Sequence, residues 1–100
     1  MINVKIGKLF YEIEGHANYD NSGKDIVCSA VSALAQSTLI GLHEFSHITH
    51  HIEDGFICVH IHANNKYTQA LMFSLSEGLK NIENDYPEYI NVEREVIDEN

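Results

Sequence analysis

Cys28 and His16 are the two residues whose types and spacing could do chemistry together. If Asp25 caps a helix, Cys28 is the third helical residue, and the macrodipole of the first turn favours the thiolate, the nucleophilic form of cysteine. His16 lies twelve residues earlier in a polar loop from Gly15 to Lys24, and histidine is the base that a cysteine nucleophile uses near neutral pH. The pair therefore suggests nucleophilic catalysis. A buried helix cysteine beside an unconnected surface histidine is the alternative that spacing leaves open.

The residues before this pair predict a hairpin. Apolar side chains alternate over residues 2–13, and Gly7-Lys8 suits a two-residue turn of type II′. That turn would pair Ile6 with Leu9 and put the apolar side chains of both strands on one face.

The residues after the pair predict two helices. Apolar periodicity indicates one helix from Ile26 to about Ile40 and another from about Lys66 to Asn84, which Tyr86-Pro87 ends. The inward stripe expected of the first helix is Val27, Val31, Leu34 and Thr38, and that of the second is Leu71, Leu75, Leu79 and Ile82.

A second hairpin is predicted between the helices, at Asp54-Gly55, because this dipeptide favours a type I′ turn. Its register would pair Ile52 with Ile57, and residues 89–92 could add a last strand. The resulting order of elements predicts an α+β two-layer sandwich, in which a mainly antiparallel sheet of four to five strands carries two helices on one face. We expect a single domain over residues 1–100.

Composition narrows the function classes. The chain has 100 residues, of which 6 are basic and 15 acidic, for a net charge of −9, and 44% are apolar. That charge argues against a nucleic-acid surface and allows a basic partner. No stretch resembles a signal peptide or the roughly 18–20 apolar residues of a membrane span, and two cysteines are too few for a disulfide scaffold. We therefore expect a soluble cytoplasmic protein with free thiols and no membrane or nucleic-acid partner.

Histidines around the second hairpin raise a metal site as an alternative. The predicted register puts imidazole and thiol groups, which suit zinc, on or beside one face of that hairpin: His47, His51, His60, His62 and Cys58. Their spacing matches no recognised ligand pattern, so we predict no metal and no other cofactor. Cys58 is interpreted as a small apolar filler of its strand.

Three motifs carry a resemblance to a known family. They are Gly15-His16-Ala17, then Gly23-x-Asp25-Ile26-Val27-Cys28-x-Ala30-Val31-Ser32-x-Leu34, and finally Tyr86-Pro87-x-Tyr89-Ile90. In this order and spacing the chain resembles the ribosomal-processing cysteine protease family, Prp. Ser29 departs from the family pattern, which more often has alanine there, and residues 43–62 match only in general pattern.

The resemblance implies a cytoplasmic bacterial endopeptidase, usually a homodimer. Such an enzyme removes a short N-terminal extension from the precursor of the twenty-seventh large-subunit ribosomal protein. Cys28 matches the family nucleophile, His16 its base, and Asp25 an acidic residue that caps the helix, orients His16, or both. The N–H groups of Cys28 and Ser29 are candidate oxyanion donors, and the loop from Ala17 to Lys24 is expected to close over a bound peptide. A non-catalytic dimeric module that binds a ribosomal protein is the alternative.

Overall fold

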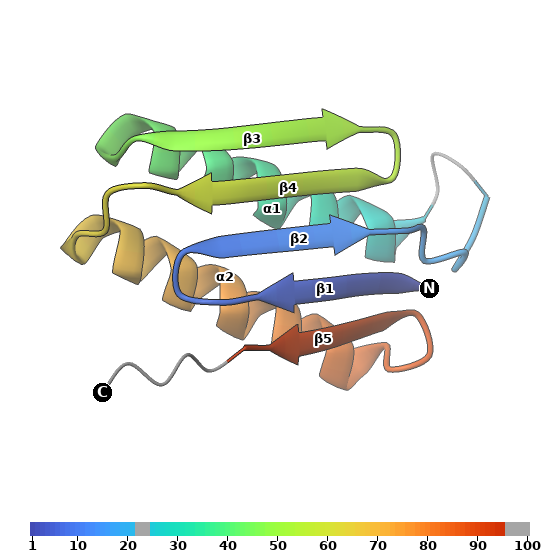
Figure 1. The fold of residues 1–100 in the computed structure, drawn as a ribbon. Coiled ribbons are helices and arrows are strands. Elements are labelled where there is room, and N and C mark those ends of the chain that lie inside the picture. The colour runs from blue at the N-terminus through green and yellow to red at the C-terminus, as the bar shows by residue number, and fades with distance from the viewer. Residues whose placement is uncertain (22–24, 96–100) are drawn as a thin grey trace.

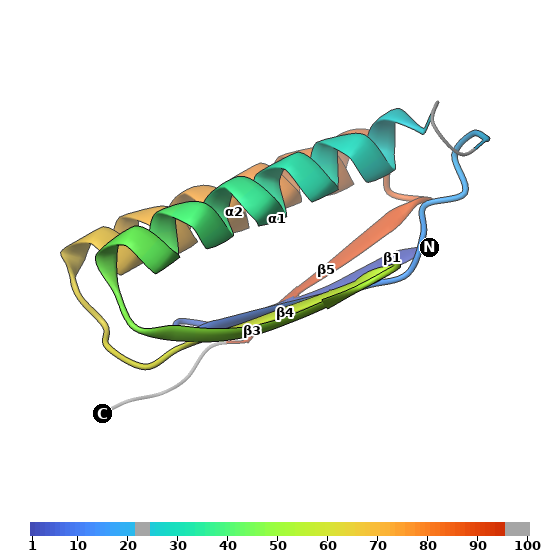
Figure 2. The ribbon, with the colours of Figure 1, turned by 90° about the horizontal axis from the view of Figure 1, so that it is seen from above.

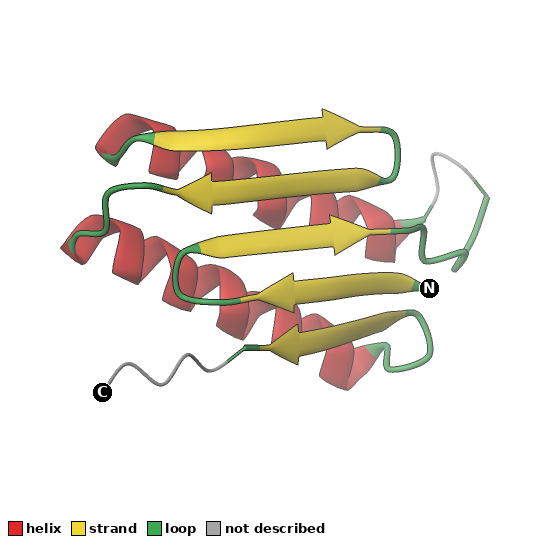
Figure 3. Ribbon diagram, viewed as in Figure 1, coloured by secondary structure: helices red, strands yellow, loops and turns green. Residues whose placement is uncertain are grey.

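A five-stranded sheet carries both helices on one face (Figure 1). The computed structural model describes residues 1–21 and 25–95. In chain order the elements are β1 (Ile2–Ile6), β2 (Phe10–Glu14), α1 (Ile26–Phe45), β3 (Ile48–Glu53), β4 (Phe56–Ile61), α2 (Lys66–Asp85) and β5 (Ile90–Arg94) (Figure 3).

The predicted α+β two-layer sandwich is confirmed. Seen along the sheet, α1 and α2 lie side by side in one layer and the strands form the other (Figure 2). The strand order is β3-β4-β2-β1-β5. Of the pairings in the described part of the chain, those of β1 with β2, β2 with β4 and β3 with β4 are antiparallel, and that of β1 with β5 is parallel.

The core fills the space between the two layers. Alternate residues of each inner strand and one stripe of each helix are buried, as binary patterning requires. Tyr11 is completely buried, and its hydroxyl donates a 2.8 Å hydrogen bond to the Ala35 carbonyl, which ties the middle of α1 to the sheet. This contact helps to fix the height of α1 above the strands.

The turn predicted for the first hairpin is wrong by one position. Ile6 pairs with Tyr11 instead of Leu9, and the Gly7 N–H donates to the Phe10 carbonyl at 2.9 Å. Lys8 and Leu9 therefore form the two-residue turn. Because side chains alternate with a period of two, this two-residue shift in register leaves every core side chain of the strands on its predicted face.

The second hairpin and the helix starts agree with the sequence. Ile52 pairs with Ile57 across the Asp54-Gly55 turn, and Asp25 caps α1 as expected. The first helix runs further than predicted, to Phe45, since Leu42 continues its buried stripe. Its predicted Leu34 is only half-buried, and Ala35 takes the core position instead.

Helix α1 is apolar to an unexpected degree. By length and composition alone it could cross a membrane, although the sequence had suggested no such stretch. Its stripe of Val27, Val31, Ala35, Thr38 and Leu42 is buried against the rest of the protein. That is the packing of a core helix.

Candidate active site

Asp25 builds the start of α1 around Cys28. One oxygen of its carboxylate accepts the Cys28 N–H at 2.9 Å, and the other accepts the Tyr19 N–H at 3.0 Å. Burial raises the pKa of Asp25, but these backbone donors lower it by more, so the net pKa lies below the ordinary value. The side chain therefore stays ionised, caps the helix and holds the preceding loop against it.

The loop that carries His16 is fixed on both sides of the histidine. Gly15 has a φ of +102°, a conformation that glycine adopts without strain, and its N–H donates to the Gly55 carbonyl at 2.8 Å. On the other side, the buried Ala17 donates its N–H to the Cys28 Sγ at 3.2 Å. The chain around His16 is thus bound to the β3–β4 turn and to the candidate nucleophile.

Tyr19 anchors the same loop to the other end of the chain. Its ring makes edge-to-face contacts with Tyr86, at 5.6 Å between centroids, and with Tyr89, at 5.0 Å. These contacts join the His16 loop to the segment between α2 and β5. The expected closure of the loop over a peptide falls partly on residues 22–24, which lie outside the described residues.

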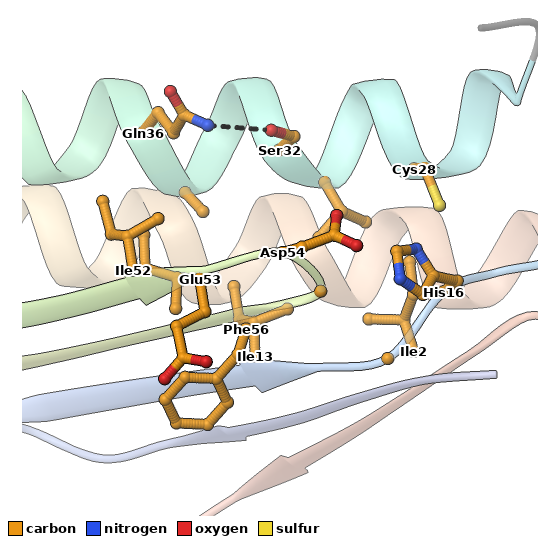
Figure 4. Close-up of a pocket in the computed structure, with 15 residues that line it drawn as sticks. Ile2, Ile13, His16, Cys28, Ser32, Gln36, Ile52, Glu53, Asp54 and Phe56 are labelled. Carbon is orange, nitrogen blue, oxygen red and sulfur yellow. Dashed lines mark hydrogen bonds between the residues drawn. The ribbon is translucent and has the colours of Figure 1, made fainter. Parts of the chain in front are cut away.

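Cys28 and His16 line one cavity of about 240 Å³. It lies between α1 and the ends of β3 and β4, with the half-buried thiol above and the exposed imidazole below (Figure 4). Its apolar lining is Ile2, Ile13, Val31, Ala35, Ile52, Phe56 and Ile57, and its polar lining includes Ser32, Gln36, Glu53 and Asp54. An apolar lining with a few polar groups is typical of ligand-binding pockets.

The two remaining predicted site residues have defined places. Asp25 caps the helix, and the hydrogen bonds described for its carboxylate run to Cys28, Tyr19 and no histidine. The N–H groups of Cys28 and Ser29 both donate to Asp25, to the carboxylate and to the carbonyl respectively. To act as oxyanion donors, they would have to exchange these partners for the substrate.

Several contributors to the cavity were not evident in the sequence. Ser32 and Gln36, which are hydrogen-bonded to each other at 3.1 Å, present polar groups along α1. Gly55 lies against the His16 ring, and Tyr19 anchors the loop. The helical spacing of Ser32 and Gln36 behind Cys28 is a signal that could have found those two.

His51 and His60 lie on the sheet face away from the helices, whereas His50 lies on the face toward them, across from the buried Val59. His51 pairs with Cys58 across the strands and contacts Glu53, and the Cys58 Sγ lies 3.4 Å from His60 Nε2. Burial and the charge of Glu12 raise the pKa of Cys58. Among residues 1–21 and 25–95, no group of three or more His, Cys, Asp or Glu side chains is placed to hold a metal ion.

Comparison with solved structures finds the same fold elsewhere. Two structures of the essential ribosomal processing protease Prp from S. aureus, one with a covalently linked product peptide and one with a substrate peptide, give TM-scores of 0.89 and 0.83. They are 24% and 23% identical, and each match covers 95% of this chain and 100% of the other. SMU.848 from Streptococcus mutans is 21% identical with a TM-score of 0.72, over 96% of this chain and 93% of its own.

Sequence comparison gives the family. No relative is found among curated proteins, whereas the sequence model described as cysteine protease Prp matches residues 1–91. That range contains the capped helix, the histidine loop and every residue that lines the cavity. The chain therefore belongs to the cysteine protease Prp family.

Proposed function

We propose that this protein is a cysteine endopeptidase in which Cys28 is the nucleophile and His16 the base. Its proposed substrate is the precursor of the twenty-seventh large-subunit ribosomal protein, from which it removes a short N-terminal extension. The observation that carries the proposal is the hydrogen bond from Ala17 to the Cys28 sulfur, next to the histidine and in the same cavity.

The chemistry follows from these positions. The Cys28 sulfur lies in the first turn of α1 and accepts a hydrogen bond from the Ala17 N–H. His16 takes the thiol proton, the thiolate attacks the scissile carbonyl, and an acyl-enzyme forms as His16 returns the proton to the leaving amine. Water then attacks the acyl-enzyme, releases the acid and restores the thiol.

Charge supports a basic substrate. The chain carries a net charge of −9, and Glu53 and Asp54 are among the residues that line the cavity. A basic ribosomal protein would be attracted over distances up to the Debye length, roughly 10 Å at 0.1 M salt. Association should therefore be faster at low ionic strength.

We further propose that the protein acts in the cytoplasm as a homodimer, without a cofactor and without nucleic-acid or membrane partners. The acidic charge supports a protein substrate over a nucleic acid. The two cysteines are free thiols, and a reducing compartment such as the cytoplasm would keep them so.

The decisive experiment uses a peptide that spans the extension junction of the host's own ribosomal protein. It is incubated with the parent protein, with Cys28→Ala and with the matched control Cys58→Ala, and the products are read by mass spectrometry. A single cut made by the parent and by Cys58→Ala, but not by Cys28→Ala, supports the protease. A peptide that binds but is cut by none of the three overturns it in favour of a non-catalytic module that binds the ribosomal protein.

A further inference from the structure

Gly55 lies directly against the imidazole of His16. A Cβ built on Gly55 would stand 2.8 Å from His16 Nε2 and 3.4 Å from both Cδ2 and Cε1. The three nearest atoms thus all belong to one ring. Contacts under 3.0 Å are essentially never made by a real Cβ, so a side chain at position 55 would require the end of the His16 ring to shift.

The same turn also holds the backbone beside His16. The Gly55 carbonyl accepts the Gly15 N–H at 2.8 Å, one residue before the histidine. A Cβ on Gly15 would in turn come within 2.4 Å of the Met1 carbonyl oxygen, so the loop passes close to the residue that precedes β1. The β3–β4 turn therefore supports the histidine twice, through its carbonyl and through its missing side chain.

We propose that Gly55 is a positioning residue for His16. It sets the place of the imidazole opposite Cys28, and this inference rests on the proposed function. Catalytic groups must be held within about 0.5 Å of their productive positions. A side chain at residue 55 would push the free end of the His16 ring by several tenths of an ångström while leaving the fold intact, since that end is the most easily displaced part.

Two constraints favour glycine at position 55, its backbone conformation and its contact with His16, and they can be tested separately. Its φ of +73° is a backbone conformation that alanine tolerates poorly but asparagine adopts comparatively well. Any Cβ at this position, that of asparagine included, would displace the His16 ring. If backbone strain were the only constraint, Gly55→Asn would keep the parental kcat. If Gly55 positions the His16 ring, Gly55→Asn should lower kcat.

The experiment compares Gly55→Asn and Gly55→Ala with the parent on the junction peptide, with thermal unfolding measured alongside. We expect kcat to fall roughly tenfold or more in both variants with little change in KM, since a displaced catalytic group slows the reaction. Gly55→Asn should unfold at a higher temperature than Gly55→Ala. Parental kcat in Gly55→Asn, or a loss of kcat that follows the loss of stability, would overturn the inference.

A matched control comes from the other hairpin. A Cβ on Gly7 would meet the Phe10 ring at 2.6 Å, which is the same kind of contact. Gly7 lies beside the β1–β2 turn, at the end of the sheet opposite the start of α1 (Figure 1). Gly7→Ala should therefore keep the parental kcat. A loss there as large as in Gly55→Asn would overturn the inference.

The outcomes also separate this inference from the proposed function. If Cys28→Ala and His16→Ala both cut like the parent, the proposed protease is wrong. If neither cuts while Gly55→Asn cuts normally, only the role of Gly55 is wrong. A readout without substrate is the imidazole C–H NMR signal of His16, which must shift in Gly55→Asn and stay in place in Gly7→Ala.

Discussion

The Ala17 N–H donates to the Cys28 sulfur across 3.2 Å, from the loop that carries His16 to the first turn of α1. The same turn receives the loop a second time through Asp25, which accepts the Tyr19 N–H. The candidate nucleophile and its base are therefore positioned by one set of backbone contacts. A change that loosens the loop should alter the reactivity of the thiol as well as the place of the histidine.

The two thiols should differ in reactivity. We expect iodoacetamide at pH 7 to alkylate Cys28 on the order of tenfold faster than Cys58, because Cys28 has the helix start and the Ala17 N–H, whereas burial and Glu12 raise the pKa of Cys58. Peptide mass spectrometry over a time course measures both rates in one sample. Glu12→Gln should speed alkylation of Cys58 alone. Equal rates in the parent would contradict the environment described for Cys28.

Stability should depend on Asp25 in acid. The pKa of Asp25 is lower in the folded state, so the folded protein binds this proton less tightly than the unfolded chain. Its stabilising contribution is therefore full above the unfolded pKa of about 3.9 and is lost as pH falls through the folded value. Asp25→Asn should flatten the fall in unfolding temperature below about pH 4. A parental acid profile in that variant would argue against the role.

Loss of the cap should have its own cost at neutral pH. Asp25→Ala removes the acceptor for the N–H groups of Cys28 and Tyr19, and should lower the free energy of unfolding by roughly 1 kcal/mol. Asp20→Ala is the matched control, since Asp20 is an exposed loop aspartate that accepts only from its neighbour Asn21 among the hydrogen bonds described. Chemical denaturation of both variants checks this, and equal losses would contradict it.

Tyr11→Phe should destabilise the protein without disturbing its packing. The variant removes the hydrogen bond to the Ala35 carbonyl but leaves the ring, at an expected cost of about 1 kcal/mol. Urea unfolding measures the change, and the slope against urea concentration should stay parental. An unchanged midpoint would show that the bond contributes nothing net.

Tyr19→Ala should lower the reactivity of Cys28, although Tyr19 is not among the residues that line the cavity. It removes the contacts with Tyr86 and Tyr89, each worth roughly 1 kcal/mol, and so releases the loop that supplies the Ala17 N–H. Alkylation of Cys28 should become slower. The matched control is Tyr67→Ala, a tyrosine of similar exposure that stacks on Phe45 instead. A slowing equal in both variants would contradict the prediction.

Local patterns determined most of the fold. Alternation and helical periodicity identified the strands and helices, and Asp54-Gly55 identified the second turn, because each signal lies within a few residues of the structure it controls. The first turn was misplaced because Gly7-Lys8 and Lys8-Leu9 keep the same faces. Gly7-Lys8 was preferred because glycine suits the first position of a type II′ turn, and the apolar pattern does not distinguish the two positions.

Part of the candidate site could also be predicted from local sequence patterns. Asp25 as a cap and Cys28 as the third helical residue follow from local sequence. The contacts that position His16 cannot be predicted in this way, because Gly55 and Tyr89 are far from the loop in sequence and reach it only in the folded protein. Such contacts between distant segments have no signature in a single sequence.

The position of β1 also constrains how the chain can fold. β1 lies between β2 and β5 in the sheet. The Ile2 N–H donates to the Tyr89 carbonyl, so a hydrogen bond joins residues near opposite ends of this sequence. During synthesis β1 keeps an open edge until β5 has left the ribosome. Pairings this distant in sequence slow folding, and an unpaired apolar strand invites association between nascent chains. A truncation before Ile90 should therefore yield aggregates instead of a smaller folded protein.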